Sequence, residues 1–211
     1  MKRGKYKLKK RAERQEETRL RIARATLELH ETLGPSLTTI SAIAERAGVG
    51  RPTVYSHFPD ELSLLMACSS LEFSENPLPD PGPWGEISDP QRRLRAALAE
   101  LYAYFRRREG LWANLLRDQE MLHTKDNPDV RETDDETKDP IFAHWERMKV
   151  TLARGWESPD GPPQPLLGAI GLALDFQTWR TMARQQGLSD EQAIELMVGM
   201  VRCAAGVAGP G

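Results

Sequence analysis

The chain has 211 residues, of which 39% are hydrophobic and 28% are charged. This composition excludes an intrinsically disordered chain, and the length allows one large domain or two small ones. No apolar run reaches the roughly 18 residues of a membrane span, and the basic N-terminus lacks the apolar stretch of a secretory signal, so we expect a cytoplasmic protein with no membrane partner.

The net charge of −2 is distributed unevenly along the chain. Residues 1–60 carry thirteen Lys or Arg and seven Asp or Glu, which gives +6, whereas the remaining 151 residues carry sixteen and twenty-four, which gives −8. Such an asymmetry indicates that the N-terminal part contacts a polyanion and that the rest of the chain does not.

The two cysteines, Cys68 and Cys203, lie far apart in the sequence, and neither belongs to a CxxC pair. The four histidines show no metal-ligand spacing around them. We interpret both cysteines as structural thiols rather than as a disulfide or a metal site, and we expect neither a metal nor a cofactor.

Residues 1–15 are the most basic part of the chain, with eight Lys or Arg and a single Glu within the first fourteen positions. Because like charges at this density repel one another, we predict a flexible arm that becomes ordered only on a partner. Such an arm can lie along DNA phosphates or enter a minor groove, and each contact releases a counterion. The alternative is a solvated tail without a specific role. The arm residues expected to contact DNA are Lys9, Lys10, Arg11 and Arg14.

Residues 16–67 are predicted to form a domain of helices joined by short turns. Apolar side chains recur at helical spacing from about residue 16 to residue 33, and glycine and proline at positions 34 and 35 end this first helix. A second, short helix starts at a hydroxyl cap supplied by Thr38 or Thr39. It ends at Gly48, which suits a left-handed C-cap and opens a tight turn through Gly50. A further helix starts near residues 59 and 60.

The segment Arg51–Phe58 is predicted to be a third helix that begins at Gly50 or Arg51, because its second residue is a proline that only a first helical turn tolerates. Val54 and Phe58, four positions apart, point toward the core. The remaining polar side chains then face outward. Arginine there can bind a guanine edge through two hydrogen bonds, and threonine can contact a thymine methyl group. The alternative is a helical hairpin with a solvated polar face.

The stretch from residue 38 to residue 59 carries Thr-Thr-Ile at 38–40, Ile-Ala-Glu-Arg-Ala-Gly-Val at 43–49 and Thr-Val-Tyr-Ser-His-Phe-Pro at 53–59. With these residues it resembles the N-terminal domain of TetR-family regulators. The resemblance covers about residues 18–67. It implies an Ω-shaped homodimer whose two reading helices enter successive major grooves of a palindromic operator, with an all-helical C-terminal domain that binds a small effector.

The resemblance also implies which residues contact double-stranded DNA. Base contacts are expected at the start of the third helix, from Arg51, Pro52 and Thr53. Phosphate contacts are expected from the start of the second helix and from the outer side of the third. The full set outside the arm is Thr39, Ser41, Arg51, Pro52, Thr53, Tyr55, Ser56 and His57.

Three positions depart from the family's pattern. Ser41 stands where arginine is common, Glu61 where lysine is common, and His30 where an aromatic such as phenylalanine is usual. The first two weaken the phosphate contacts, and our hypothesis is that the basic arm compensates for them. We interpret His30 as a half-buried structural histidine rather than a switch.

Residues 68–211 are predicted to form a second domain, for ligand binding and dimerisation, in which every periodic segment is helical. The proline-rich segments 74–90 and 158–165 and the acidic segment 124–140 are expected to be connections. The final two helices are predicted at about 166–186 and 190–207. The expected fold is all-α, with an N-terminal three-helix helix-turn-helix domain, a C-terminal helical bundle and about nine helices in total.

The last two helices carry many small residues, among them Gly168, Gly171 and Gly199. Small residues allow helices to approach closely, so we predict a homodimer through these two helices. The alternative is that they pack only within one chain.

Aromatic and other large side chains on the middle helices are the candidates for lining the pocket of a small-molecule effector. Aromatic residues at helical spacing can equally belong to an ordinary core. A largely uncharged wall of this kind would suit a flat or hydrophobic molecule. The candidates are Tyr102, Phe105, Trp112, Met121, His123, Phe142, Trp145 and Trp156.

The sequence contains no HExxH, GxSxG or phosphate-loop motif, so we do not expect an enzyme. We predict a sequence-specific DNA-binding transcriptional regulator. By the default of the family it resembles, it is expected to be a repressor that an effector releases from its operator. The alternative is a helical adaptor of the same fold with weak or no DNA binding, which Ser41 and Glu61 would suit.

Overall fold

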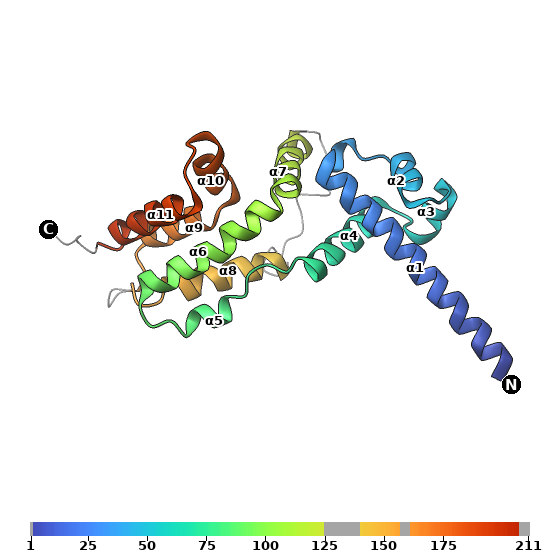
Figure 1. Cartoon of the computed structure of the whole chain (residues 1–211), viewed down its shortest axis with the longest axis horizontal. Helices are drawn as coiled ribbons and strands as arrows, with labels where there is room; N and C mark the ends of the chain where they lie inside the picture. The colour runs from blue at the N-terminus through green and yellow to red at the C-terminus, as the bar shows by residue number, and fades with distance from the viewer. Residues whose placement is uncertain (1, 125–139, 157–160, 207–211) are drawn as a thin grey trace. The chain divides into compact units, whose positions relative to one another are not determined.

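The computed structural model of the chain describes residues 2–124, 140–156 and 161–206 (Figure 1). Within these ranges the regular structure is helical and no β-strand occurs, which confirms the predicted all-α fold. The chain divides into two compact units, and each unit is built from two segments. Unit 1 comprises Met1–Pro77 with Glu109–Asp126, and unit 2 comprises Leu78–Arg108 with Asn127–Gly211.

Unit 1 contains the predicted helix-turn-helix segment together with one helix from much later in the chain. Its elements are α1 (Lys2–Thr32), the short 3-10 helix η1 (Pro35–Leu37), α2 (Ile40–Ala47), α3 (Arg51–His57), α4 (Glu61–Glu75) and α7 (Glu109–Thr124). The helix α7 packs against α1 and η1. A boundary at residue 68, as the sequence suggests, would divide α4 and place α7 in the other unit.

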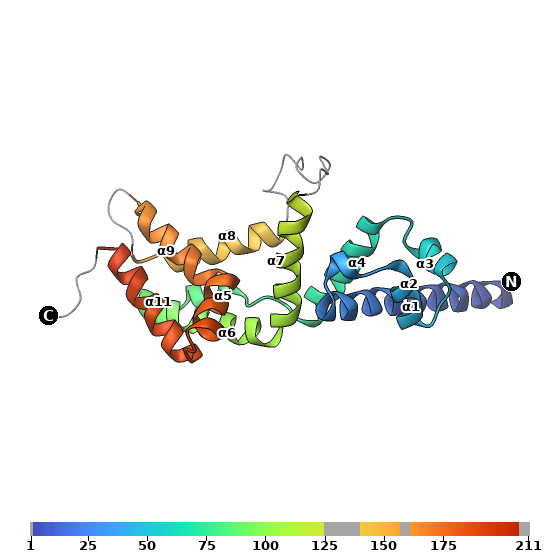
Figure 2. The same ribbon diagram turned by 90° about the horizontal axis from the view of Figure 1, so that it is seen from above.

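The first helix is longer than predicted. α1 begins at Lys2, and its N-terminal half extends beyond α2, α3 and α4 (Figures 1 and 2). The predicted arm at residues 1–15 is thus helical from Lys2 onward, and its flexibility stays a prediction. Lysine, arginine, glutamate and leucine favour helix, and extending an existing helix requires no new nucleation. One pair of opposite charges also offsets the repulsion, since Lys9 Nζ lies 3.9 Å from Glu13 Oε1 one turn later.

The core of unit 1 joins α1, α2, α3 and α4. Ile22 on α1 and Val54 on α3 are completely buried, and Phe58 at the end of α3 is 2% exposed. The inward direction predicted for Val54 and Phe58 is confirmed. Leu33, which continues the apolar stripe of α1 in the sequence, is 42% exposed because the helix ends at Thr32.

Unit 2 is a bundle around α6, which packs against α5, α8, α9 and α11. Its elements are α5 (Pro81–Gly85), α6 (Pro90–Arg107), α8 (Pro140–Ala153), α9 (Gln164–Leu174), α10 (Phe176–Arg180), the π-helix η4 (Thr181–Gln185) and α11 (Asp190–Ala204). The described residues thus contain eleven α-helices, compared with the nine or so predicted. Figure 1 shows both places where the count differs, α5 and the break between α9 and α10.

Both differences have a local cause. The prediction that 74–90 contains no helix is wrong at α5, where Pro81 lies in the first turn and the Asp80 carboxylate accepts a hydrogen bond from the Gly82 amide at 3.0 Å. The predicted helix 166–186 breaks at Asp175. The Asp175 carboxylate accepts from the amide of Thr178 at 2.6 Å and so caps the start of α10.

Candidate nucleic-acid interface

The turn between α2 and α3 is set by two glycines. Gly48 has φ 64° and ψ 39°, the left-handed conformation that glycine adopts most easily, and its amide donates to the last turn of α2. Gly50 is the extended N-cap of α3, and Pro52 lies in the first turn of that helix. The predicted C-cap and the predicted start of the third helix are confirmed. A short, closed turn of this kind fixes the direction of α3 relative to α2.

The seven residues of α3 separate into a buried side and an exposed side. Val54 lies in the core, whereas the side chains predicted to read or grip DNA lie outward. Tyr55 is 49% exposed despite its large ring. The exposed residues are Arg51, Pro52, Tyr55 and Ser56, and the half-buried ones are Thr53 and His57.

A contact that the sequence does not reveal holds the far end of α3. The Arg19 guanidinium, on α1, donates to the His57 carbonyl at 3.0 Å and lies over the Phe58 ring, 4.4 Å from its centroid. The carbonyls of a last helical turn have no partner within the helix, and a cation at this end is favourable. Arg19 therefore fixes the C-terminus of α3 from the side of α1. It does not cover the exposed side chains on the outer side of α3.

The start of α2 carries two predicted contacts, Thr39 and Ser41, both exposed. Thr39 is the N-cap, and its hydroxyl oxygen accepts from the Ala42 amide at 3.2 Å. A threonine hydroxyl has one donor and two acceptor sites, so the O–H proton of Thr39 remains available to a phosphate oxygen. Ser41 can likewise donate one hydrogen bond, although it lacks the charge of an arginine.

The basic residues predicted to contact DNA from the N-terminal segment, Lys9, Lys10, Arg11 and Arg14, are all exposed on α1. Their positions within one helix mean that they point in successive directions around its axis. Glu61, the reversed charge at the start of α4, is exposed too, beside the N-cap Asp60. An acidic side chain in a first turn stabilises that helix through its dipole.

The predicted effector-pocket residues do not form one group. Trp112, on α7, belongs to unit 1, as do Met121 and His123, whose side chains lie outside the described ones. In unit 2, Tyr102 and Phe105 are completely buried, and the Tyr102 hydroxyl donates to the Ala173 carbonyl at 3.1 Å. Burial raises the pKa of Tyr102, so its hydroxyl stays protonated.

Aromatic rings around Phe105 fill the interior of unit 2. The Phe105 ring meets Phe176 edge-on at 5.3 Å and lies 5.8 Å from Trp179 and 6.4 Å from Trp145, measured between centroids. Such arrangements are typical of a packed core. Trp156 is 7% exposed.

A groove of about 670 Å³ lies on unit 2 between α5 and α8. Of the predicted pocket residues, Phe142 lines it, next to Val150 of the same helix; both are exposed, at 39% and 56%. The side chains that line it also include the charged Glu146 and Arg147.

The described residues offer neither a membrane span nor a metal-binding cluster. No helix among them combines the length and the apolar character that crossing a membrane requires. In the same part of the chain, no group of three or more His, Cys, Asp or Glu is arranged to hold a metal ion.

The helices α2 and α3, joined at a left-handed glycine and packed on α1 and α4, form a helix-turn-helix domain. Residues 22–68 match the family described as bacterial regulatory proteins, tetR family. Residues 22–68 are therefore a TetR-family regulatory domain.

Two curated regulators resemble part of the chain. The HTH-type transcriptional regulator SrpR of Pseudomonas putida is 46% identical over 59 residues, 28% of each chain. The HTH-type transcriptional repressor KstR of Rhodococcus jostii is 33% identical over 87 residues, 41% of this chain and 40% of KstR. The chain thus aligns with less than half the length of each of these relatives.

Solved structures resemble the chain over most of its length. A tetR-family transcriptional regulator from Streptomyces coelicolor matches with a TM-score of 0.58 and 20% identity, over 91% of this chain and 80% of its own. A TetR-like transcriptional regulator from a Rhodococcus species matches with a TM-score of 0.56 and 20% identity, over 91% and 96%. At this level of identity the similarity establishes the fold.

Proposed function

We propose that the chain is a sequence-specific DNA-binding transcriptional regulator. The observation that carries the proposal is the polar outer side of α3, which is exposed while Val54 and Phe58 fix the helix in the core. A helix presented in this way fits the B-DNA major groove, which is about 12 Å wide. The TetR-family domain at residues 22–68 and the regulators that resemble it support the same function.

Within this proposal the start of α3 reads bases. The Arg51 guanidinium can pair with the O6 and N7 atoms of a guanine, and Pro52 and Thr53 can contact a thymine methyl group. Tyr55 and His57 grip phosphates, with Ser56 between them. The phosphate contacts orient the helix, and the base contacts supply the sequence preference.

The helical form of the N-terminal segment changes what it can do. An α-helix with its side chains is about 10–12 Å across, whereas the minor groove is about 6 Å wide. We therefore propose that Lys9, Lys10, Arg11 and Arg14 contact backbone phosphates rather than the floor of the minor groove. In this way they add a salt-dependent affinity that offsets Ser41 and Glu61.

We also propose a homodimer formed through the last helices, α9 to α11. Leu172 on α9 and Leu196 and Met200 on α11 are 50%, 47% and 41% exposed. Gly168 and Gly199 lie on the same faces of these helices, four and three positions away, so a partner helix can approach closely. A two-fold interface that covers these side chains would remove apolar surface from water and pair two α3 helices for a palindromic operator.

The proposal also includes a small effector that releases the protein from its operator. The relative KstR, an HTH-type transcriptional repressor, supports a repressor role for this chain. The residues offered for the effector pocket in unit 2 are Tyr102, Phe105, Phe142, Trp145 and Trp156. Phe105 and its ring neighbours are tightly packed, so an effector would need to displace or enlarge this cluster, whereas Phe142 already borders a groove.

Selection of bound duplexes from a random DNA pool tests the function directly. The expected result is a palindromic consensus, because a two-fold dimer reads two equal half-sites. Arg51→Ala is expected to relax the preference at one position in each half-site, at a cost of about 1–3 kcal/mol. Tyr55→Phe is expected to weaken binding to all sequences about equally.

Arg92→Ala serves as the control, since Arg92 is an exposed arginine of unit 2. An unchanged consensus for Arg51→Ala would show that Arg51 does not read a base. A wild-type chain that enriches no sequence and forms no salt-sensitive complex would instead favour a helical adaptor. Ser41 and Glu61, both exposed and neither basic, are the residues that favour this alternative.

A further inference from the structure

We infer that three polar side chains of α7, Asn114, Arg117 and Asp118, position the helix-turn-helix by clamping the end of α1 and the linker that leads into α2. The inference rests on the DNA-binding function proposed above. In the proposal these residues do not contact DNA. They act by holding the backbone at the end of α1 and in the linker. We refer to the three as the α7 clamp.

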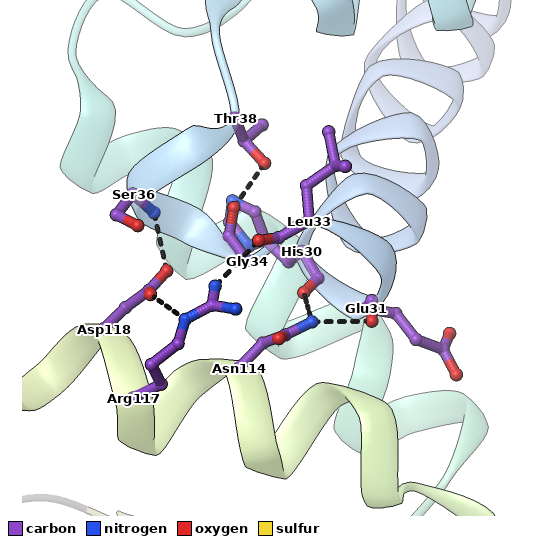
Figure 3. Close-up of polar contacts among 9 residues, drawn as sticks. All are labelled: His30, Glu31, Leu33, Gly34, Ser36, Thr38, Asn114, Arg117 and Asp118. Carbon is purple, nitrogen blue, oxygen red and sulfur yellow. Dashed lines mark hydrogen bonds and ion pairs between the residues drawn. The ribbon is translucent and has the colours of Figure 1, made fainter.

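The first part of the α7 clamp holds the end of α1 (Figure 3). The Asn114 side-chain amide donates to the carbonyls of His30 and Glu31, at 3.2 and 2.8 Å. Arg117 Nη2 donates to the Leu33 carbonyl at 2.8 Å. The last carbonyls of a helix lack intrahelical partners, and the Glu31 and Leu33 carbonyls lie at or just beyond the end of α1; the His30 carbonyl also accepts from the Gly34 amide at 3.1 Å. The direction in which the chain leaves α1 is thereby fixed.

The second part of the clamp holds the linker. Asp118 Oδ2 accepts from the Ser36 amide at 2.8 Å, and Oδ1 accepts from Arg117 Nε at 2.9 Å. The Asp118 side chain is completely buried, whereas that of Arg117 is 48% exposed. Burial alone would raise the pKa of Asp118, but the hydrogen bonds from Arg117 and Ser36 outweigh it and hold the pKa below its usual value. Asp118 is therefore an ionised, buried carboxylate that anchors the backbone of η1.

The linker itself is shaped to fit the clamp. Gly34 has φ 92°, which side-chain-bearing residues rarely adopt, and a Cβ there would collide with the Arg117 guanidinium and the Asp118 carboxylate. The Gly34 carbonyl in turn accepts from the Thr38 hydroxyl at 2.7 Å. The next residue is Thr39, the N-cap of α2 and a proposed phosphate contact. Hydrogen bonds from α7 and within the linker therefore hold the backbone that leads directly to the start of the helix-turn-helix.

The clamp lies outside the segment that defines the TetR-family domain. That segment ends at residue 68, and α7 begins at Glu109. The DNA-binding unit therefore needs residues contributed from more than forty positions beyond its family domain. The geometry predicts that loosening the clamp displaces α2 and the α3 helix that follows it, while the charges that attract DNA stay in place.

The experiment compares full-length variants on the operator selected by the wild-type chain and on an unrelated duplex. Asp118→Asn removes the charge at nearly constant shape, Arg117→Met keeps the apolar stem of a half-exposed side chain, and Asn114→Ala removes two donors. Arg106→Met is the matched control, because the Arg106 guanidinium also donates two hydrogen bonds, both to Asp190 in unit 2, at 2.9 and 2.6 Å. The measurements are both dissociation constants, with active protein counted by stoichiometric titration, and the thermal unfolding midpoint.

We expect the clamp variants to lose about tenfold in affinity for the operator, the scale of one charge-assisted hydrogen bond, with little change on the unrelated duplex. The control should keep both affinities. A purely structural defect would lower the active fraction and the unfolding midpoint without changing the ratio of the two constants. If folded clamp variants keep the wild-type ratio while the wild type does select an operator, the inference is wrong. If the wild type selects none, the proposed function fails first and the inference falls with it.

Discussion

Each unit holds the C-terminus of one of its helices with polar side chains of another helix, but the two solutions differ. In unit 2, one guanidinium, that of Arg93, donates to the Thr151 and Arg154 carbonyls at the end of α8, at 3.3 and 2.6 Å. It also donates twice to the Ile87 carbonyl, at 2.9 and 2.6 Å. In unit 1, the end of α1 meets the α7 clamp, in which Arg117 is half exposed.

The difference lies in how each charge is compensated. Arg93 is 5% exposed, and the partners found for it among the described residues are neutral carbonyls, at the negative end of the α8 dipole. Opening that contact would leave a buried cation and several partly buried acceptors unsatisfied. Arg117 can exchange its partners for water, so the contacts of Arg117 cost less to open than those of Arg93, while the buried Asp118 carboxylate keeps its hydrogen bond from Ser36. The comparison indicates a permanent joint in unit 2 and, at Arg117, an adjustable one in unit 1.

The largest effect is expected from Arg93→Met. It should destabilise the chain by about 2–3 kcal/mol, because the partly buried carbonyls of Ile87, Thr151 and Arg154 all lose their donor. Urea unfolding would measure the loss, with the adjacent exposed Arg92→Met as control. Arg93→Lys should fall between the two, since an ammonium keeps the charge with fewer directed donors. Equal midpoints for the two methionine variants would contradict a buried joint.

A smaller effect is expected from Gly34→Ala, which tests how closely the linker fits the α7 clamp. The positive φ and the collision with Arg117 and Asp118 act together, so we expect a loss of about 2 kcal/mol. Gly48→Ala is the matched control, because Gly48 also has positive φ but has open space around it. Its cost should stay near 1 kcal/mol, roughly that of the backbone conformation alone. Similar losses in thermal unfolding for both variants would show that the clamp can move aside freely.

The parts of the fold that follow from neighbouring residues could be predicted from the sequence. Gly48 as a left-handed cap, Pro52 in a first turn, and Val54 with Phe58 one turn apart each act within a few positions. These features define α2, the turn and α3, and they bring the proposed DNA contacts to an exposed surface. The basic segment at residues 1–15 behaves differently from these local features. Repulsion between its charges predicts a flexible segment, but the helix propensity of the same residues places them in α1 from Lys2 onward.

The contacts between distant residues could not be predicted in this way. Arg19 and His57 are 38 positions apart, and Ser36 and Asp118 are 82 apart. In the sequence, Arg19 and Arg117 look like any surface arginine, and nothing local indicates which carbonyl each one meets. The aromatic residues of unit 2 pose a related problem, since helical spacing is the same for a packed ring cluster around Phe105 and for the wall of a pocket.

The smallest expected effect concerns His30, a buried histidine at the end of α1. Its protonation tests the adjustable joint between α1 and α7. His30 is 7% exposed, and its Nδ1 lies 3.8 Å from Cys68 Sγ on α4. Burial lowers the pKa of His30, and the charge of Asp118 on α7 offsets this only in part. Burial also raises the pKa of the Cys68 thiol to about 11, so Cys68 stays uncharged. His30 is therefore neutral in the folded chain at neutral pH.

A histidine whose pKa is lower in the folded state than in the unfolded state stabilises the fold least in acid. Above the unfolded pKa of about 6.5 both states are neutral, and below it the unfolded state binds the extra proton, so stability falls as the pH drops toward the folded pKa. His30→Phe should remove this part of the decline while the wild type keeps it, and unfolding midpoints at pH values from about 7.5 down to 5 would show the difference. His57→Phe, at a half-buried position on α3, is the control. Parallel curves for wild type and His30→Phe would mean that His30 is protonated without cost, and hence that the joint between α1 and α7 already admits water.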